Sequence, residues 1–378
     1  MLQMASHVQD RPRVAREDLG GPEELSAHRV RSRLLFVLVL AAVVVAVVVL
    51  LPGLGELRTR LEHAGAGWLF AGVGLKVLSG IGYVAVFRMV FCRRMSYQVG
   101  MSELGANALF PTGGAGGLAL GAWALKRGGM PGEDIARRTV AFFLLTSVPN
   151  VLGVIVIGLL LATGAVGGEG NLLLSALPAA IAAGAVVLAL QAGRIARRWG
   201  GALERRGEHE LSRRKQLLMK GLTALGEGVQ GAVALLREGN LVLIGGLIAY
   251  LAFDVMIVWA TFHALGPTPA LAILWMAYLI GELGGLIPIP GGIGGVDAGL
   301  IGTLALYNVS LASATGAVLA YRAIALWVPA VLGGIAFALL RRTLRNEAQE
   351  IALCAPQQEI EVIGLGRVRI GGEPRVVK

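Results

Sequence analysis

The chain has 378 residues, of which 55% are hydrophobic and only 15% are charged. Soluble globular domains carry about 25% charged residues, so this composition excludes a soluble enzyme. The net charge is +10. In a membrane protein, Lys and Arg gather in the loops on one side of the membrane, so this charge does not indicate binding to nucleic acid.

Apolar segments recur along the chain, and the first begins after a charged tail of 33 residues. No cleavage site for a signal peptide follows it, so we interpret it as a membrane span. Crossing a bilayer takes about 20 apolar residues. The apolar segments are 34–52, 66–92, 101–125, 138–163, 172–192, 241–265, 270–307 and 311–340. The predicted domains are a cytoplasmic tail at 1–33, a transmembrane domain at 34–340 and a cytoplasmic tail at 341–378.

Lys and Arg are unevenly distributed among the loops: they are frequent in 193–240 and absent from 164–171 and 266–269. Basic loops are typically cytoplasmic, which predicts a multi-pass protein of a bacterial-type inner (plasma) membrane with both termini in the cytoplasm. Segment 101–125 then begins and ends inside, and segment 270–307 begins and ends outside. Because 101–125 is too short to cross twice, we expect two oppositely oriented re-entrant hairpins in an all-α polytopic bundle.

The basic loop 193–240 also contains apolar residues at spacings of three and four, which is typical of an amphipathic helix. They are Leu218, Leu222, Leu225, Val229, Val233 and Leu236. This helix is expected either on the inner membrane surface or against the bundle, and the sequence favours neither.

The two hairpin segments share a motif. ELGANALFPTGGAGG runs from Glu103 to Gly117, and ELGGLIPIPGGIGG runs from Glu282 to Gly295. Proline interrupts a helix, and backbone amides exposed by glycines attract anions such as phosphate. A repeat with opposite membrane orientation is typical of transporters, although glycines also serve close helix packing alone.

Charged residues inside apolar segments cost about 2.5–3.5 kcal/mol each on insertion scales. We interpret them as a polar passage in which Arg322 and Lys76 meet a phosphate. The carboxylates would balance those cations, meet a cationic headgroup or carry a coupling proton; a structural ion-pair network is the alternative. The predicted translocation site consists of Glu103, Asn107, Pro111, Gly113, Gly114, Glu282, Pro288, Pro290, Gly291, Gly292, Gly294, Asp297, Tyr321 and Arg322, with Lys76 and Asp254 as supporting charges.

No motif for catalysis or metal binding stands out. The sequence contains no GxSxG and no phosphate-binding glycine loop ending in Lys-Ser or Lys-Thr. Cys92 and Cys354 form no CxxC pair, and no histidine lies at ligand spacing from Cys or Asp. We therefore expect no enzyme activity, no cofactor and no metal.

Two blocks carry a family resemblance: Glu282–Gly302 (ELGGLIPIPGGIGGVDAGLIG) and Tyr321–Pro329 (YRAIALWVP). Over roughly residues 30–340 the chain resembles the transmembrane, flippase-like region of lysylphosphatidylglycerol synthases, in which an acidic residue, here Asp297, commonly follows the glycine block. The resemblance implies a helical bundle that moves aminoacylated or other phospholipids, or a lipid-linked glycan, between leaflets. The synthases continue into a soluble aminoacyl-transfer domain; because this sequence ends 38 residues after segment 311–340, lipid aminoacylation is not expected.

The favoured function is therefore a translocator (flippase) of a phospholipid or lipid-linked headgroup. One alternative is a membrane-embedded enzyme or accessory subunit acting on a polyprenyl-phosphate-linked lipid, and another is an ion-coupled transporter of a small solute. The expected partners are anionic or aminoacylated phospholipids or a lipid-linked glycan, no nucleic acid, and, as an open option, further copies of the chain.

Overall fold

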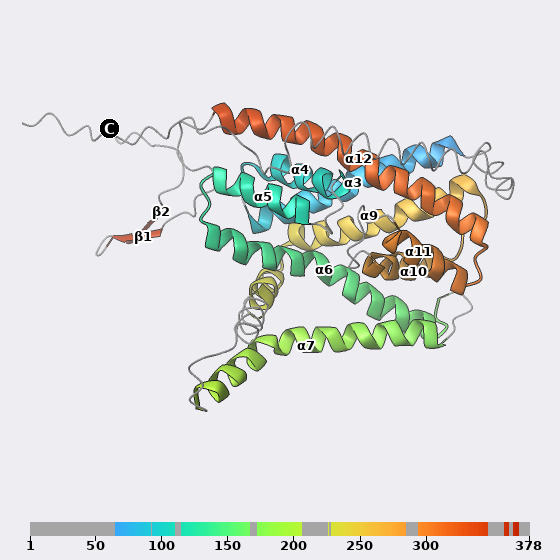
Figure 1. Ribbon diagram of the computed structural model, residues 1–378, viewed down its shortest axis with the longest axis horizontal. Coiled ribbons are helices and arrows are strands. Elements are labelled where there is room, and N and C mark those ends of the chain that lie inside the picture. The colour runs from blue at the N-terminus through green and yellow to red at the C-terminus, as the bar shows by residue number, and fades with distance from the viewer. Residues whose placement is uncertain are drawn as a thin grey trace, which may run out of the picture.

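The computed structural model describes residues 65–91, 93–109, 115–166, 172–205, 226, 228–284, 294–346, 359–362 and 366–369. These residues form an elongated bundle of helices (Figure 1). The labelled helices are α3 (Ala66–Val90), α4 (Ser96–Leu109), α5 (Ala115–Arg127), α6 (Gly132–Ala162), α7 (Leu172–Arg205), α9 (Leu241–Leu265), α10 (Leu271–Gly284), α11 (Gly295–Leu306) and α12 (Leu311–Asn346). Strands β1 (Glu359–Val362) and β2 (Gly366–Arg369) pair antiparallel near the C-terminus.

Five of the described helices are long and apolar enough to cross a membrane: α3, α6, α9, α12 and the stretch Leu174–Gln191 of α7. Large apolar side chains stay exposed on them, such as Val156 and Leu159 on α6 and Ile181 on α7. Exposed apolar surface on this scale is unusual for a water-soluble monomer and suits contact with lipid tails. The predicted all-α, multi-pass membrane fold is confirmed.

Each segment expected to form a hairpin contains two short helices, α4 with α5 and α10 with α11. Helices α4 and α10 have 14 residues each, or about 21 Å, against a hydrocarbon core of about 30 Å. The members of each pair contact each other, and Gly281 and Gly284 of α10 face the first residues of α11. These helix pairs are compatible with re-entrant hairpins, which remain a prediction.

Residues 66–162 and 241–346 repeat the same order of helices: long, short, short, long. The first helices of the two halves, α3 and α9, are antiparallel neighbours. The amide of Gly65 donates to the carbonyl of Ala264 at one end, and Gly246 meets Gly82 at the other. Equivalent contacts follow, because α4 lies against α12 while α10 lies against α6. The two halves therefore form an inverted repeat.

A further repeated motif supports this relation and was not used in the sequence prediction. VPNVLG occupies Val148–Gly153 in α6, and VPAVLG occupies Val328–Gly333 in α12. The proline lies inside the helix both times, so the two long closing helices also match.

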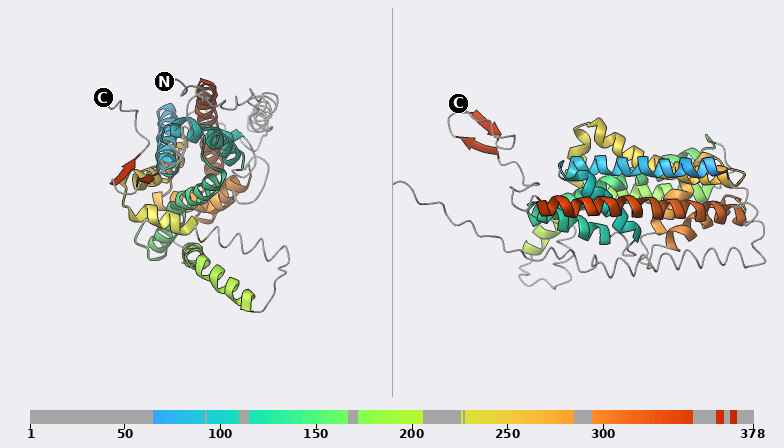
Figure 2. Two further views of the ribbon diagram at one scale, coloured as in Figure 1. Left: turned by 90° about the vertical axis from the view of Figure 1, so that its left-hand side faces the viewer. Right: turned by 90° about the horizontal axis from the view of Figure 1, so that it is seen from above.

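The two hairpins approach the middle of the bundle from opposite ends (Figures 1 and 2). Contacts along α12 show which parts of the hairpins lie closest to its centre. Asp297 at the start of α11 contacts Arg322, and Gly105 near the end of α4 meets Gly333. Gln98, near the start of α4, bonds to Thr343, closer to the C-terminal end of α12. The end of α4 and the beginning of α11 therefore both face the central part of α12.

Several boundaries differ from the sequence prediction. Helix α7 continues to Arg205 and α12 continues to Asn346, beyond the apolar segments, because helices do not end where the membrane does. In the loop 193–240, residues 228–237 are helical and lie against α6, with Gly228 next to Val140 and Ala232 buried. These contacts favour packing on the bundle over the membrane surface. Residues 1–64, which include the predicted tail and first span, and 206–225 lie outside the described residues.

Candidate functional site

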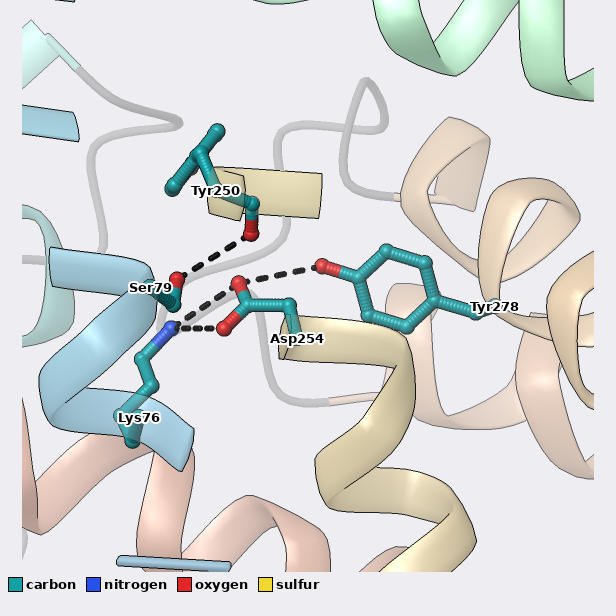
Figure 3. Close-up of polar contacts among 5 residues, drawn as sticks. All are labelled: Lys76, Ser79, Tyr250, Asp254 and Tyr278. Atoms are coloured by element: carbon teal, nitrogen blue, oxygen red, sulfur yellow. Dashed lines mark hydrogen bonds and ion pairs between the residues drawn. The ribbon is translucent and has the colours of Figure 1, made fainter. Parts of the chain in front are cut away.

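One buried ion pair joins the two halves of the repeat. Lys76 lies near the middle of α3 and Asp254 near the middle of α9. Nζ of Lys76 is 2.8 Å and 2.9 Å from the two carboxylate oxygens of Asp254 (Figure 3). The two side chains are only 10% and 6% exposed. Because each charge meets its opposite charge, burial is compensated, and Lys76 offers little to a ligand in this conformation.

The sequence separation of Lys76 and Asp254 relates this pair to the inverted repeat. Lys76 and Asp254 are 178 residues apart, the same separation as between Gly113 and Gly291 of the repeated glycine blocks. The two charged residues thus occupy nearly equivalent positions in the two halves. The ion pair lies close to the axis that relates them.

Two further contacts surround this pair in Figure 3. The Tyr278 hydroxyl of α10 donates to Oδ2 of Asp254 at 3.3 Å, and the Ser79 hydroxyl donates to the backbone carbonyl of Tyr250 at 3.2 Å. Tyr278 was not predicted as a site residue. The available signal was its position one helical turn before Glu282, which places both side chains on one face of α10.

A second ion pair lies where the second hairpin meets α12. Nε of Arg322 donates to Oδ1 of Asp297 at 2.7 Å, and Nη2 lies 2.5 Å from the same oxygen. The side chains are 25% and 20% exposed, more than twice the values for Lys76 and Asp254. Nη2 is itself buried, and within the described residues it makes this ion-pair contact without a hydrogen bond of standard geometry.

Asp297 has a structural role as well. Its Oδ2 accepts from the amide of Gly294 at 3.1 Å, and this contact satisfies a backbone donor at the start of α11. Gly294 has φ of +110°, a conformation that side chains rarely adopt. The second glycine block therefore ends in a turn that orients Asp297 toward α12.

Glu282 and Tyr321 complete the cluster of predicted residues around Arg322. Glu282 interacts electrostatically with Arg322, Lys76 and Asp254. The ring of Tyr321 meets Tyr278 edge to face, with centroids 6.2 Å apart. Tyr278 therefore touches both Asp254 and Tyr321, and it connects the surroundings of the two ion pairs.

The first hairpin holds the other predicted polar residues. Glu103 of α4 is only 3% exposed, and its carboxyl group forms a hydrogen bond with the hydroxyl of Tyr83. The amide of Gly117 donates to Oδ1 of Asn107 at 2.9 Å. Asn107 thereby connects α4 to the first turn of α5, so its side chain stabilises the hairpin.

The structure places seven of the predicted residues in one region: Lys76, Asp254, Glu282, Gly294, Asp297, Tyr321 and Arg322. Glu103 and Asn107 lie in the first hairpin instead. The predicted residues Pro111, Gly113, Gly114, Pro288, Pro290, Gly291 and Gly292 lie outside the described residues. Within the described part of the chain, no group of three His, Cys, Asp or Glu side chains could hold a metal ion.

Comparison with known proteins gives one family. The sequence model described as the lysylphosphatidylglycerol synthase transmembrane region matches residues 35–333, well over half of the chain. No curated protein and no solved structure matches the chain.

Proposed function

Because the chain belongs to the lysylphosphatidylglycerol synthase transmembrane-region family, we propose that it translocates a phospholipid or lipid-linked headgroup across a bacterial-type inner membrane. The family indicates a lipid-related function in a membrane. The headgroup crosses near the two helix hairpins while its acyl or prenyl tails remain in the bilayer.

The observation that carries this proposal is the partly exposed Arg322–Asp297 pair in the central part of the bundle. A charge at this depth is costly unless it is paired or serves a passage. The nearby Lys76–Asp254 pair is closed, so the partly exposed Arg322 side chain is the cationic group best suited to meet a phosphate.

Binding would proceed by exchange of partners. A phosphate oxygen accepts hydrogen bonds from the Arg322 guanidinium, which forms strong charge-assisted bonds with phosphate. Asp297 is then released from Arg322 but stays attached to the Gly294 amide. Its free oxygen and the Glu282 carboxyl can receive an ammonium group from the same headgroup. The arrangement thus suits headgroups that carry a phosphate, with or without an amine.

Flipping in reconstituted vesicles tests the proposal. Vesicles of phosphatidylethanolamine and phosphatidylglycerol would carry a trace of fluorescent phosphatidylglycerol, and dithionite would bleach the outer leaflet. We expect the protein to bring the label to the outer leaflet, and Arg322→Gln to slow this at least about tenfold. Unchanged protection in protein-containing vesicles would contradict a phosphatidylglycerol flippase, and uptake of free glycerol phosphate instead would support a solute transporter.

The proposed orientation places both termini in the cytoplasm and can be tested separately. In a background with Cys92 and Cys354 replaced by Ser, single cysteines would be introduced at positions 132 and 168. Position 132 should react with a membrane-impermeant maleimide only in inside-out vesicles, and position 168 only in intact cells. The reverse pattern would overturn the orientation.

A further inference from the structure

Glu103 is a buried carboxyl group without a cationic partner in the described part of the chain. It lies on α4 and faces α5 closely, since a Cβ at Gly121 would be 3.1 Å from its Oε2. On α3 it meets the hydroxyl of Tyr83, and on α9 it interacts electrostatically with Tyr250. No ion pair between Glu103 and a described Lys or Arg is formed.

The corresponding glutamate of the second hairpin has different surroundings. Glu282 occupies the same place in the repeated motif as Glu103, but it interacts with the cations Lys76 and Arg322. At the position of α6 that matches Arg322 of α12, aligned by VPNVLG and VPAVLG, the first half has Phe142. Phe142 lies against the ring of Tyr83, so an apolar ring replaces the cation.

A carboxylate in such surroundings is unfavourable. Burying an ionised carboxyl group without a cation costs several kcal/mol, and such a group normally takes up a proton instead. A protonated carboxyl group can still accept the hydrogen bond from a tyrosine hydroxyl. A metal cation is less suited, because Tyr83 and Glu103 supply few oxygen ligands and no cluster of acidic side chains is present among the described residues.

We propose that Glu103 is a proton-binding site of the first hairpin that couples lipid translocation to the proton gradient. In this step a proton from water or hydronium binds a carboxylate oxygen of Glu103 on one side of the membrane. The carboxyl group loses that proton to water on the other side, so no electron transfer or second reactant is needed. The coupling rests on the proposed translocation, whereas the proton site itself does not.

Infrared spectroscopy of the purified protein tests the proton site. Near neutral pH we expect a C=O stretching band of a protonated carboxyl group that disappears in Glu103→Gln. Glu133→Gln is the matched control, because Glu133 is exposed in the first turn of α6 and its substitution should leave the band intact. A band unchanged in Glu103→Gln would overturn the proposal.

Coupling is tested with vesicles that contain the pH-sensitive dye pyranine. An imposed pH gradient should drive protein-dependent proton entry in wild type and in Glu133→Gln but not in Glu103→Gln. The ratio of flipping rates of fluorescent phosphatidylglycerol with and without the gradient should fall to about one in Glu103→Gln. If wild type moves protons but no lipid, the translocation proposal fails and the proton site stands; if Glu103→Gln moves protons as wild type does, the proton site fails.

Discussion

The two ion pairs of the bundle use the same chemistry in different surroundings. Lys76 and Asp254 are enclosed between α3 and α9, with both carboxylate oxygens engaged. Arg322 and Asp297 are partly exposed where the second hairpin meets α12, and their contact uses a single carboxylate oxygen of Asp297. The first pair joins the two halves, whereas the second is the pair that we propose exchanges partners with a ligand.

The repeat explains why the two pairs differ. The closed pair lies close to the axis and uses one residue from each half, so both halves contribute equally to it. The open pair belongs to the second half alone, since the first half has Phe142 where α12 has Arg322. The scaffold is therefore symmetric, while the charges that would meet a ligand are not.

Breaking the closed pair should have the largest effect. Lys76→Ala or Asp254→Ala leaves one charge buried without a partner, which costs about 3–5 kcal/mol. We expect little monodisperse protein on size-exclusion chromatography in detergent. Because the two positions are nearly equivalent, the exchange Lys76→Asp with Asp254→Lys should restore most of the folded fraction. An exchange as damaging as either single change would show that the pair does more than join the halves.

Breaking the open pair should affect transport more than folding. Arg322→Gln removes charge-assisted hydrogen bonds worth about 1.5–3 kcal/mol, which corresponds to roughly a 10- to 100-fold lower flipping rate. Its melting temperature in detergent should change much less than that of Lys76→Ala, because Asp297 is partly exposed and stays bonded to Gly294. Equal losses of melting temperature in the two variants would remove the distinction between the pairs.

The sequence predicted the fold class and most of the charge cluster for physical reasons. Apolar length and charge in the loops are local properties, so the spans and the two short-helix segments could be located from the chain alone. The burial cost of charge singled out Lys76, Asp254 and Arg322 before any contact was known.

The pairing itself could not be predicted in the same way. Lys76 had several possible carboxylate partners, and only the antiparallel packing of α3 and α9 selects Asp254. Tyr278 was missed because its position one turn before Glu282 is a weak signal, and its hydroxyl partner Asp254 lies on another helix. Glu103 and Glu282 have matching motifs, yet their different neighbours come from other helices, so the sequence could not separate them.

The two halves also differ in how closely their helices cross. Substitutions at these crossings should change stability less than breaking the closed ion pair does. Helix α12 lies directly against α4, and a Cβ at Gly333 would be 2.6 Å from Cα of Gly105. At the equivalent crossing of α6 with α10, Gly153 meets the flexible side chain of Leu279 instead. Gly333→Ala should therefore destabilise by about 1–3 kcal/mol, and Gly153→Ala by less.

Thermal denaturation in detergent would measure this difference, with Gly334→Ala as the control. Gly334 is the next residue of α12, and a Cβ there would have no neighbour within 4 Å. A melting temperature of Gly333→Ala equal to that of Gly334→Ala would mean that α12 does not approach α4 this closely.

The smallest expected effect is a change in melting temperature on substitution of Asp297. It distinguishes the ion pair of Asp297 with Arg322 from its hydrogen bond to the Gly294 amide. Asp297→Asn keeps a side-chain oxygen for the Gly294 amide but removes the charge that meets Arg322. Asp297→Ala removes both contacts, and a lost cap costs about 1 kcal/mol. We therefore expect equal changes in flipping rate for the two variants, but a lower melting temperature only for Asp297→Ala. Equal melting temperatures would show that the bond to Gly294 adds no stability, and the capping role of Asp297 would have to be abandoned.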